Sequence, residues 1–258
     1  MTSRVVSRVA GSMPPVLGGV SILVAWELLI RAFNVEAFLL PAPSNIVVAF
    51  GEEWQSIVEA SWVTIREVLL GLLLGVVFGV LGAYLVSRSE RVSAPLLVVA
   101  TALNCAPIIA LAPISNNWFG VTSLISKAAI AGVMVFFPVF VNCTRGFTNV
   151  NALHKDLLDS FSATDGEFVR YVRAPNALPF FFSALRLGAS LSVIGAIVAE
   201  YFGGPTKALG VYIGHEASLT KFDNAWAGIV VATLTGLTLL GVVSLVEKAL
   251  MPWAKTSS

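Results

Sequence analysis

Long runs of residues without any charged side chain dominate this sequence. Residues 68–86 and 225–246 carry no Asp, Glu, Lys or Arg over 19 and 22 positions, and residues 92–126 carry none over 35 positions. A helix of about 20 apolar residues crosses the hydrocarbon core of a bilayer. With 57% hydrophobic residues, 12% charged residues and a mean hydropathy of +0.85, the chain lies outside the range of soluble domains. We predict an all-α integral membrane protein.

About six membrane-spanning helices account for these runs. The stretch 92–126 is too long for one span and suits two, broken by Pro107, Pro113 and the turn at 116–120. Counted in order, the expected spans are residues 15–33, residues 68–86, a third within 92–126, a fourth that starts near Lys127, a fifth that ends at Ala199, and residues 225–246. The loop 201–224 is expected to hold a short helix on the outer side.

The first span carries an acidic and a basic residue four positions apart. Glu27 and Arg31 therefore share one helix face and are expected to pair, as an anchor at the interface or as a buried functional ion pair. Ser44 is expected to cap an amphipathic helix over residues 46–60 that lies along the outer interface. Glycines at every fourth position of 71–82 predict a face for close helix packing.

One stretch, residues 151–186, is rich in charge and must lie in water between spans. Leu153, Leu157, Leu158, Phe161 and Phe168 recur at helical intervals, with acidic residues between them. We expect an amphipathic helix here, which prolines 175 and 179 end before the next helix starts. Arg186 is expected to reach the carboxylates or carbonyls of this loop. Such a helix beneath a membrane bundle is typical of a docking element.

Basic residues are distributed unequally between the two sides of this topology. Ten lie on the side that holds both termini and the loop 151–179, and five lie at or near the other side. The positive-inside rule therefore places the termini and this loop in the cytoplasm. The net charge of +1 provides no basic field that would attract nucleic acid.

The loop resembles the EAA loop of ABC importer permeases. With Pro175 on the proline of that motif, Asp156, Leu157 and Leu158 stand on the E-A-A triplet and Ser162 stands on its glycine. Val172 and Ala174 take the places of its Ile and Leu, and residues 176–179, 184–186 and 197–200 also look like that family. The resemblance covers roughly residues 39–246. It is most specific to the branch that imports nitrate, taurine and other sulfonates, and pyrimidine precursors of thiamine.

The resemblance implies a type I importer permease in a bacterial inner membrane. Two copies would form the pathway, two cytoplasmic ATPase subunits would bind ATP and Mg²⁺, and an extracytoplasmic binding protein would deliver the solute, with no cofactor or metal on this chain. The implied domains are 1–60, with the first helix and an outer amphipathic segment, the type-1 transmembrane domain 61–248, and a tail 249–258. The expected ATPase-coupling residues are Asp156, Leu157, Leu158, Phe161, Ser162, Ala163, Asp165, Phe168, Arg170 and Pro175.

Polar residues within the spans are candidates for the translocation pathway, because amides and charges at membrane depth are tolerated where they line a cavity. The candidates are Asn104, Asn116, Asn117, Lys127, Asn142 and Glu200. The alternative is that each amide makes hydrogen bonds between helices.

No phosphate-binding loop, metal-ligand spacing or catalytic triad is present in the sequence. If transport consumes ATP, another chain must bind it. The alternatives are an ion-coupled secondary transporter or channel, disfavoured by the scarcity of carboxylates in mid-span, and a scaffold without a pathway. For the solute, Lys127 and Arg66 favour an anion such as a sulfonate or nitrate, whereas the runs 107–117 and 137–142 look more like the pyrimidine-precursor permeases.

Overall fold

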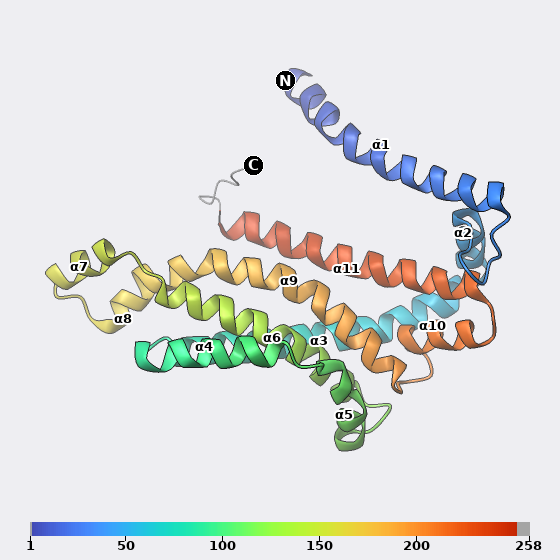
Figure 1. The fold of residues 1–258 in the computed structure, drawn as a ribbon. Coiled ribbons are helices and arrows are strands. Elements are labelled where there is room, and N and C mark those ends of the chain that lie inside the picture. Colours follow the sequence, from blue (N-terminus) through green and yellow to red (C-terminus); the bar gives the residue numbers. More distant parts are fainter. Residues whose placement is uncertain (1, 252–258) are drawn as a thin grey trace.

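The computed structural model describes the backbone of residues 2–251, and the side chains of 17–251 apart from Glu90, Lys155 and Asp159. All regular structure in this part of the chain is helical, as predicted. Figure 1 shows a bundle of long helices, from which α1 stands apart and at one end of which the short helices α7 and α8 project. The elements are α1 (Thr2–Phe33), α2 (Pro43–Glu52), α3 (Trp54–Val86), α4 (Glu90–Asn104), the 3-10 turn η1 (Ile108–Leu111), α5 (Ala112–Phe119), α6 (Leu124–Thr148), α7 (Ala152–Ser160), α8 (Asp165–Phe168), the π-helical turn η2 (Val169–Arg173), α9 (Ala174–Tyr201), α10 (Leu209–Ser218) and α11 (Phe222–Leu250).

Four helices in the described residues are long and apolar enough to cross a membrane: α3, α6, the continuous helix Asp165–Tyr201, and α11. A fifth candidate is α4 together with η1 and α5, which are bent by 77° relative to each other. The stretch 92–126 thus holds one bent pair of helices rather than two separate spans. The bend lies between Asn104 and Ile108 and includes Pro107, which has no N–H to continue a helix. The total of six spans stays a prediction, in which α1 supplies the first.

Among the helix pairs of the bundle, α3 and α6 share the most extensive contact. Glycines on α3 allow the two backbones to approach closely. A Cβ added at Gly71 would lie 2.5 Å from Cβ of Ala131, and one added at Gly75 would lie 2.6 Å from the carbonyl oxygen of Gly132. The predicted glycine face is confirmed, and α6 is its partner.

The segment before α3 differs from the prediction. The expected helix 46–60 is divided at Glu53, where the backbone leaves the helical region, so that its second half is the start of α3. The second span is therefore longer than its uncharged part, 68–86, because a helix continues through charges that face protein or water. Ser44 does not cap α2, which begins with Pro43 and has Ala42 at its N-cap.

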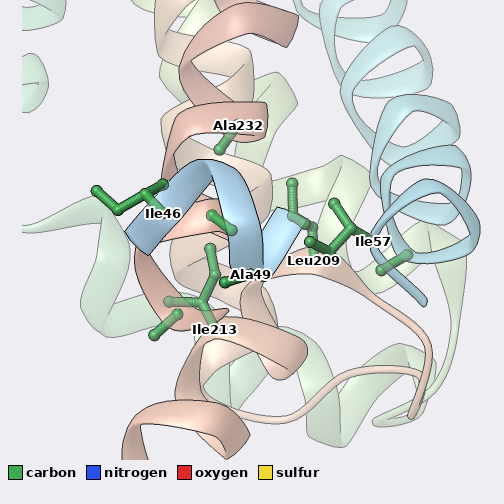
Figure 2. Close-up of a cluster of buried hydrophobic side chains, with 9 residues drawn as sticks. Ile46, Ala49, Ile57, Leu209, Ile213 and Ala232 are labelled. Atoms are coloured by element: carbon green, nitrogen blue, oxygen red, sulfur yellow. The ribbon is translucent and has the colours of Figure 1, made fainter. Parts of the chain in front are cut away.

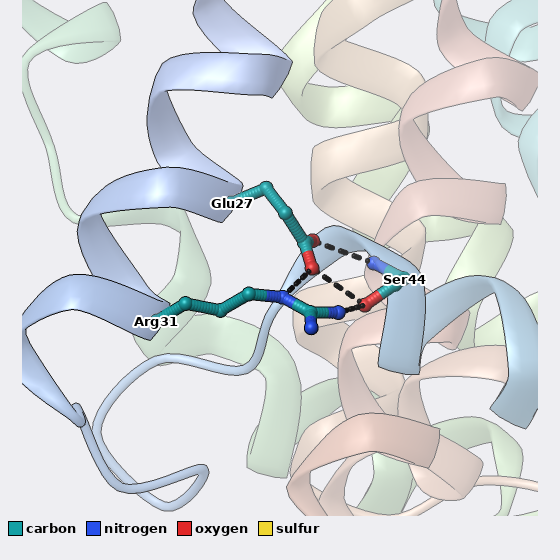
Figure 3. A network of polar contacts seen from close by, with 3 residues as sticks. All are labelled: Glu27, Arg31 and Ser44. Carbon is teal, nitrogen blue, oxygen red and sulfur yellow. Dashed lines mark hydrogen bonds and ion pairs between the residues drawn. The ribbon is translucent and has the colours of Figure 1, made fainter.

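Ser44 instead joins the predicted Glu27–Arg31 pair (Figure 3). The Arg31 Nε donates to Glu27 Oε1 at 2.6 Å, and the Ser44 backbone N–H donates to Glu27 Oε2 at 3.0 Å. The Arg31 side chain is exposed, which corresponds to the anchor alternative rather than to a buried functional pair. The pair fastens α1 to the start of α2.

At the end of the bundle opposite α7 and α8, which we call the far end, four helices share one core (Figures 1 and 2). The α10 residues Leu209 and Ile213 pack there with side chains from α2, α3 and α11. The predicted short helix in the loop 201–224 is therefore confirmed as α10, and it is an integral part of the bundle.

Candidate functional site: a surface segment at one end of the bundle

Residues 151–173, which we call the coupling segment, form two short helices rather than the single amphipathic helix that the sequence predicts. α7 ends at Ser160, and Ser162 lies in the left-handed region with φ of +53°. Thr164 then starts α8 with a capping box: its backbone N–H donates to Glu167 Oε2 at 2.8 Å, and its hydroxyl accepts from the Glu167 N–H at 3.4 Å. The single-helix prediction is wrong because these local bonds stabilise a turn at 161–164.

The prolines do not separate the coupling segment from the next span, which corrects a second prediction. Residues 165–201 form one uninterrupted helix of 37 residues, in which the π-helical turn η2 directly precedes Pro175. Because proline has no N–H, the carbonyl one turn earlier loses its usual donor. The wider turn changes the register at this point, and the Ala174 N–H donates to the Val169 carbonyl. The second half of the coupling segment, α8 and η2, is thus continuous with α9.

Large apolar side chains of the coupling segment lie on its surface. Phe161 is 75% exposed, and Leu157 and Tyr171 are exposed as well. Leu158 and Phe168 are half-buried, and the Arg173 guanidinium lies 5.0 Å from the Phe168 ring centroid. A hollow of about 410 Å³ opens beside α7, lined by His154, Leu157, Leu158, Tyr171, Val172, Pro175 and Asn176. Asp156, Ser162, Asp165 and Arg170 are exposed around these apolar side chains and Ala163 is half-buried.

Polar contacts hold this end of the bundle together. The Asn176 amide donates to the carbonyls of Gly146 at 2.7 Å and Asn149 at 3.0 Å, which fastens the start of α9 to the end of α6. Between α3 and α4, Arg88 donates to the Tyr84 hydroxyl at 2.8 Å, and this bond raises the pKa of Arg88. Arg186 forms an ion pair with Glu247 of α11. The expectation that Arg186 reaches the coupling segment is wrong, because α11 passes closer to it.

Two of the predicted pathway residues form a buried polar centre near α5. Lys127 is 0% exposed, and its Nζ donates to Asn116 Oδ1 and to the Val121 carbonyl, each at 2.5 Å. The Asn116 amide nitrogen donates to the Phe202 carbonyl at 3.0 Å, and Ser126 donates to Asn116 Oδ1 at 2.8 Å. These bonds connect α5, α6 and the end of α9, which corresponds to the alternative reading of Asn116 as a link between helices.

The remaining pathway candidates lie apart from one another. Asn104 and Asn117 are exposed, on α4 and α5. The Asn142 amide donates to the Pro138 carbonyl of its own helix at 2.8 Å. Glu200 is buried at the far end and accepts hydrogen bonds from Thr64 and Gly210. The structure therefore brings Asn116 and Lys127 together and places Glu200 within electrostatic range of Lys127, but it does not unite the six candidates in one cavity.

Comparison with known proteins identifies the chain. Residues 71–256 match the model of the family described as binding-protein-dependent transport system inner membrane component. The chain belongs to this family. It is similar to the formylaminopyrimidine transport permease protein ThiX of Halalkalibacterium halodurans, with 31% identity over 95% of this chain and 97% of ThiX. It is also similar to the riboflavin transport system permease protein RibX of Chloroflexus aurantiacus (28% identity, 90% and 87% covered) and the taurine transport system permease protein TauC of Escherichia coli (26%, 74% and 68%).

This binding-protein-dependent permease is thus the transmembrane subunit of an ABC importer, as the resemblance of its loop implied. It is a multi-pass membrane protein that works with a separate ATPase and a binding protein.

Sequence reasoning overlooked two polar residues within this permease. Glu67 is 0% exposed, its carboxyl lies close to Glu200 and Lys127, and within the described residues no group donates a hydrogen bond to its oxygens. Thr64, one turn earlier on α3, is also buried and bonds to Glu200. Both precede the uncharged run 68–86, so the span predicted from that run does not include them. The helical spacing of Thr64, Glu67 and Gly71 would have placed all three on the face that packs against the bundle.

Proposed function

We propose that two copies of this permease form a translocation pathway across the inner membrane and that the coupling segment receives the movement of two cytoplasmic ATPase subunits. The observation that carries the proposal is the highly exposed Phe161, which lies in the turn before α8, the helix that continues into a membrane span. In this arrangement both termini lie in the cytoplasm, as the bias of basic residues favours. ATP and Mg²⁺ bind to the ATPase subunits.

The exposed apolar side chains of the coupling segment would be more stable in a groove of a partner protein than in water. Burying a Phe or Leu side chain contributes about 1.5–3 kcal/mol. Leu153 and Leu157 lie exposed on α7, and Phe161 lies exposed directly after its end. The charges of Asp156, Asp165 and Arg170 surround them, as in interfaces with an apolar centre and a polar rim. Phe161 at the turn between α7 and α8 is the best candidate for the central contact.

The geometry also supports a mechanical role. A displacement of α8 must move α9, because no flexible linker separates them. At the same end, the hydrogen bonds of Asn176 connect α9 to α6, and α6 packs along α3. Closure of the ATPase subunits would therefore rotate several spans together and alternate the access of the pathway.

The test is a charge placed at the centre of the contact. We expect Phe161→Asp to weaken association with the ATPase by about 30-fold, since about 2 kcal/mol of apolar contact is lost and a carboxylate is desolvated. Phe38→Asp is the matched control, because Phe38 is an exposed phenylalanine in the loop that joins α1 to α2, away from the coupling segment. Association is measured by co-purification and solute uptake in proteoliposomes. Normal association and uptake of a correctly inserted Phe161→Asp protein would refute the docking role.

For the solute, we propose a small nitrogen heterocycle of the pyrimidine-precursor type rather than an inorganic anion or a sulfonate. The similarity to ThiX over nearly the whole chain supports this choice. Lys127, which the sequence offered as an anion-attracting group, is fully buried and already bonds to Asn116 and the Val121 carbonyl. It is therefore poorly placed to attract an anion.

Substrate choice can be tested with the complete importer. Proteoliposomes that contain the permease, its ATPase and its binding protein are expected to accumulate labelled formylaminopyrimidine, and excess taurine or nitrate is expected not to compete. If taurine competes at equal concentration, the proposed heterocyclic substrate is wrong and a sulfonate is the better candidate.

A further inference from the structure

At the far end of the bundle, three helices meet at one carboxylate. Glu200, the second-last residue of α9, is 1% exposed. Its Oε1 accepts a hydrogen bond from the Thr64 hydroxyl of α3 at 2.7 Å, and its Oε2 accepts one from the Gly210 backbone N–H of α10 at 2.5 Å. The Thr64 hydroxyl in turn accepts from the Leu209 N–H at 2.9 Å. We call Thr64, Glu200 and the two N–H groups the far-end joint.

The far-end joint supplies the cap that α10 lacks in its own sequence. The N-cap residue of α10 is Ala208, whose side chain has no acceptor. The first N–H groups of a helix need acceptors, and a carboxylate there also interacts favourably with the helix dipole. Glu200 of α9 and Thr64 of α3 provide the acceptors, and Glu200 also provides the carboxylate near the start of α10. The first turn of α10 is therefore stabilised only while α3 and α9 hold their present positions.

Close packing leaves no space in the far-end joint. A Cβ added at Gly210 would lie 2.5 Å from the Ile197 carbonyl oxygen and 2.7 Å from Glu200 Oε2. The backbone of α10 thus rests directly on the last two turns of α9. A movement of α9 along or about its axis must either carry α10 with it or break these bonds.

The helix that ends at the far-end joint begins in the coupling segment. Asp165–Tyr201 spans 37 residues without interruption, about 55 Å at about 1.5 Å per residue. Beyond the joint, α10 packs against α11 and shares the far-end core with α2 and α3 (Figure 2). The joint is therefore the place where displacement of α9 passes to the helices that close the other end of the bundle.

We propose that Glu200 and Thr64 are positioning residues of the transport cycle. Through the far-end joint, α9 moves α10 and the far-end core in step with the coupling segment, so that ATP hydrolysis is linked to opening and closing at the far end. This inference rests on the proposed coupling role of residues 151–173. A loosened joint leaves the ATPase attached and active but makes its cycles unproductive.

The experiment compares ATP hydrolysis with solute uptake in proteoliposomes of the whole importer. Thr64→Val removes the hydroxyl and keeps the shape of the side chain. We expect the number of ATP molecules consumed per solute imported to rise about tenfold, because the buried hydrogen bond to the Glu200 carboxylate is lost. Thr64→Ser keeps the hydroxyl and is expected to restore the ratio. Thr144→Val is the matched control, because Thr144 is also fully buried and its hydroxyl donates, within the described part of the chain, to the Phe140 carbonyl of its own helix rather than to another helix.

A second variant keeps the test decisive if Thr64→Val inserts poorly. Glu200→Gln has the same shape and removes the charge, and it is expected to raise the ratio in the same direction. Because both residues act in one joint, the double variant is expected to have no larger effect than the stronger single one. A normal ratio in both single variants, with normal assembly, would overturn the proposal.

The outcome is separable from that of the proposed function. Far-end variants are expected to co-purify normally with the ATPase, whereas Phe161→Asp is expected not to. If the proposed coupling role is wrong, Phe161→Asp co-purifies normally with the ATPase. If the proposal for the far-end joint is wrong, the ratio of ATP consumed to solute imported is unchanged in Thr64→Val.

Discussion

At the residue scale, the two buried carboxylates Glu67 and Glu200 differ in their partners. Among the described residues, Glu200 accepts two hydrogen bonds, whereas no group donates to the oxygens of Glu67, whose carboxyl lies close to Glu200 and Lys127. A buried carboxyl group that accepts no hydrogen bond and lies beside a second carboxyl opposes folding, and an apolar side chain of similar volume in its place removes a cost of about 1–3 kcal/mol. The same substitution is therefore expected to have opposite effects at the two positions.

We expect Glu67→Met to raise the unfolding temperature of the purified permease in detergent and Glu200→Met to lower it. In Glu200→Met, the Gly210 N–H and the Thr64 hydroxyl lose an acceptor, at a cost of about 1–3 kcal/mol each. Thermal unfolding followed by circular dichroism measures both. A lower unfolding temperature for Glu67→Met would show that this carboxylate has a stabilising partner.

Ser162 carries a second residue-scale prediction, because its φ of +53° disfavours every residue with a Cβ. Ser162→Gly is expected to stabilise the turn by about 1 kcal/mol and to slow amide hydrogen exchange of residues 152–168 about fivefold. Ser162→Ala keeps the Cβ and is expected to exchange like the original protein, while the β-branched Ser162→Val is expected to exchange faster. Equal exchange in all three variants would contradict the assigned backbone conformation.

At the element scale, the α3–α6 pair depends on the absence of side chains at the glycine face. A Cβ at Gly75 would lie 2.6 Å from the Gly132 carbonyl oxygen, so Gly75→Ala must separate the helices, at about 1–3 kcal/mol. The matched control is Gly241→Ala on α11, where no atom of the described residues lies within 4 Å of the added Cβ. We expect a lower unfolding temperature only for Gly75→Ala. An equal effect of both substitutions would argue against close packing at this face.

Elements were predictable from the sequence where a pattern repeats along one helix. The uncharged runs located the cores of α3 and α11, and the glycine spacing identified a packing face. The coupling segment was recognised by its charges and apolar residues, but its break at 161–164 depends on a φ angle and a capping box that override the helical pattern. Pro175 was read as a helix end because the compensating π-helical turn has no sequence signature.

Polar sites that involve several helices were not predictable in the same way. Asn116 and Lys127 were singled out by polarity alone, and their mutual bond depends on the bend before α5. Thr64 and Glu200 are 136 residues apart and meet only in the folded bundle. Glu67 was overlooked because it lies next to an uncharged run rather than inside it.

At the scale of the whole molecule, the coupling segment and the far end lie at opposite ends of the bundle (Figure 1). The central claim is that an ATPase subunit contacts the first of these ends. Phe161 and Trp118 are aromatic and equally accessible, at 75% and 74% exposed, but Trp118 lies on α5, far from α7. This pair allows contact with a partner to be distinguished from mere exposure.

The most direct test is photo-crosslinking within the assembled importer, with a photoreactive phenylalanine analogue placed at position 161 or at position 118. The account predicts a crosslink to the ATPase subunit from position 161 and none from position 118. A crosslink to the extracytoplasmic binding protein from position 161, or no crosslink from that position in a complex that still hydrolyses ATP, would contradict it.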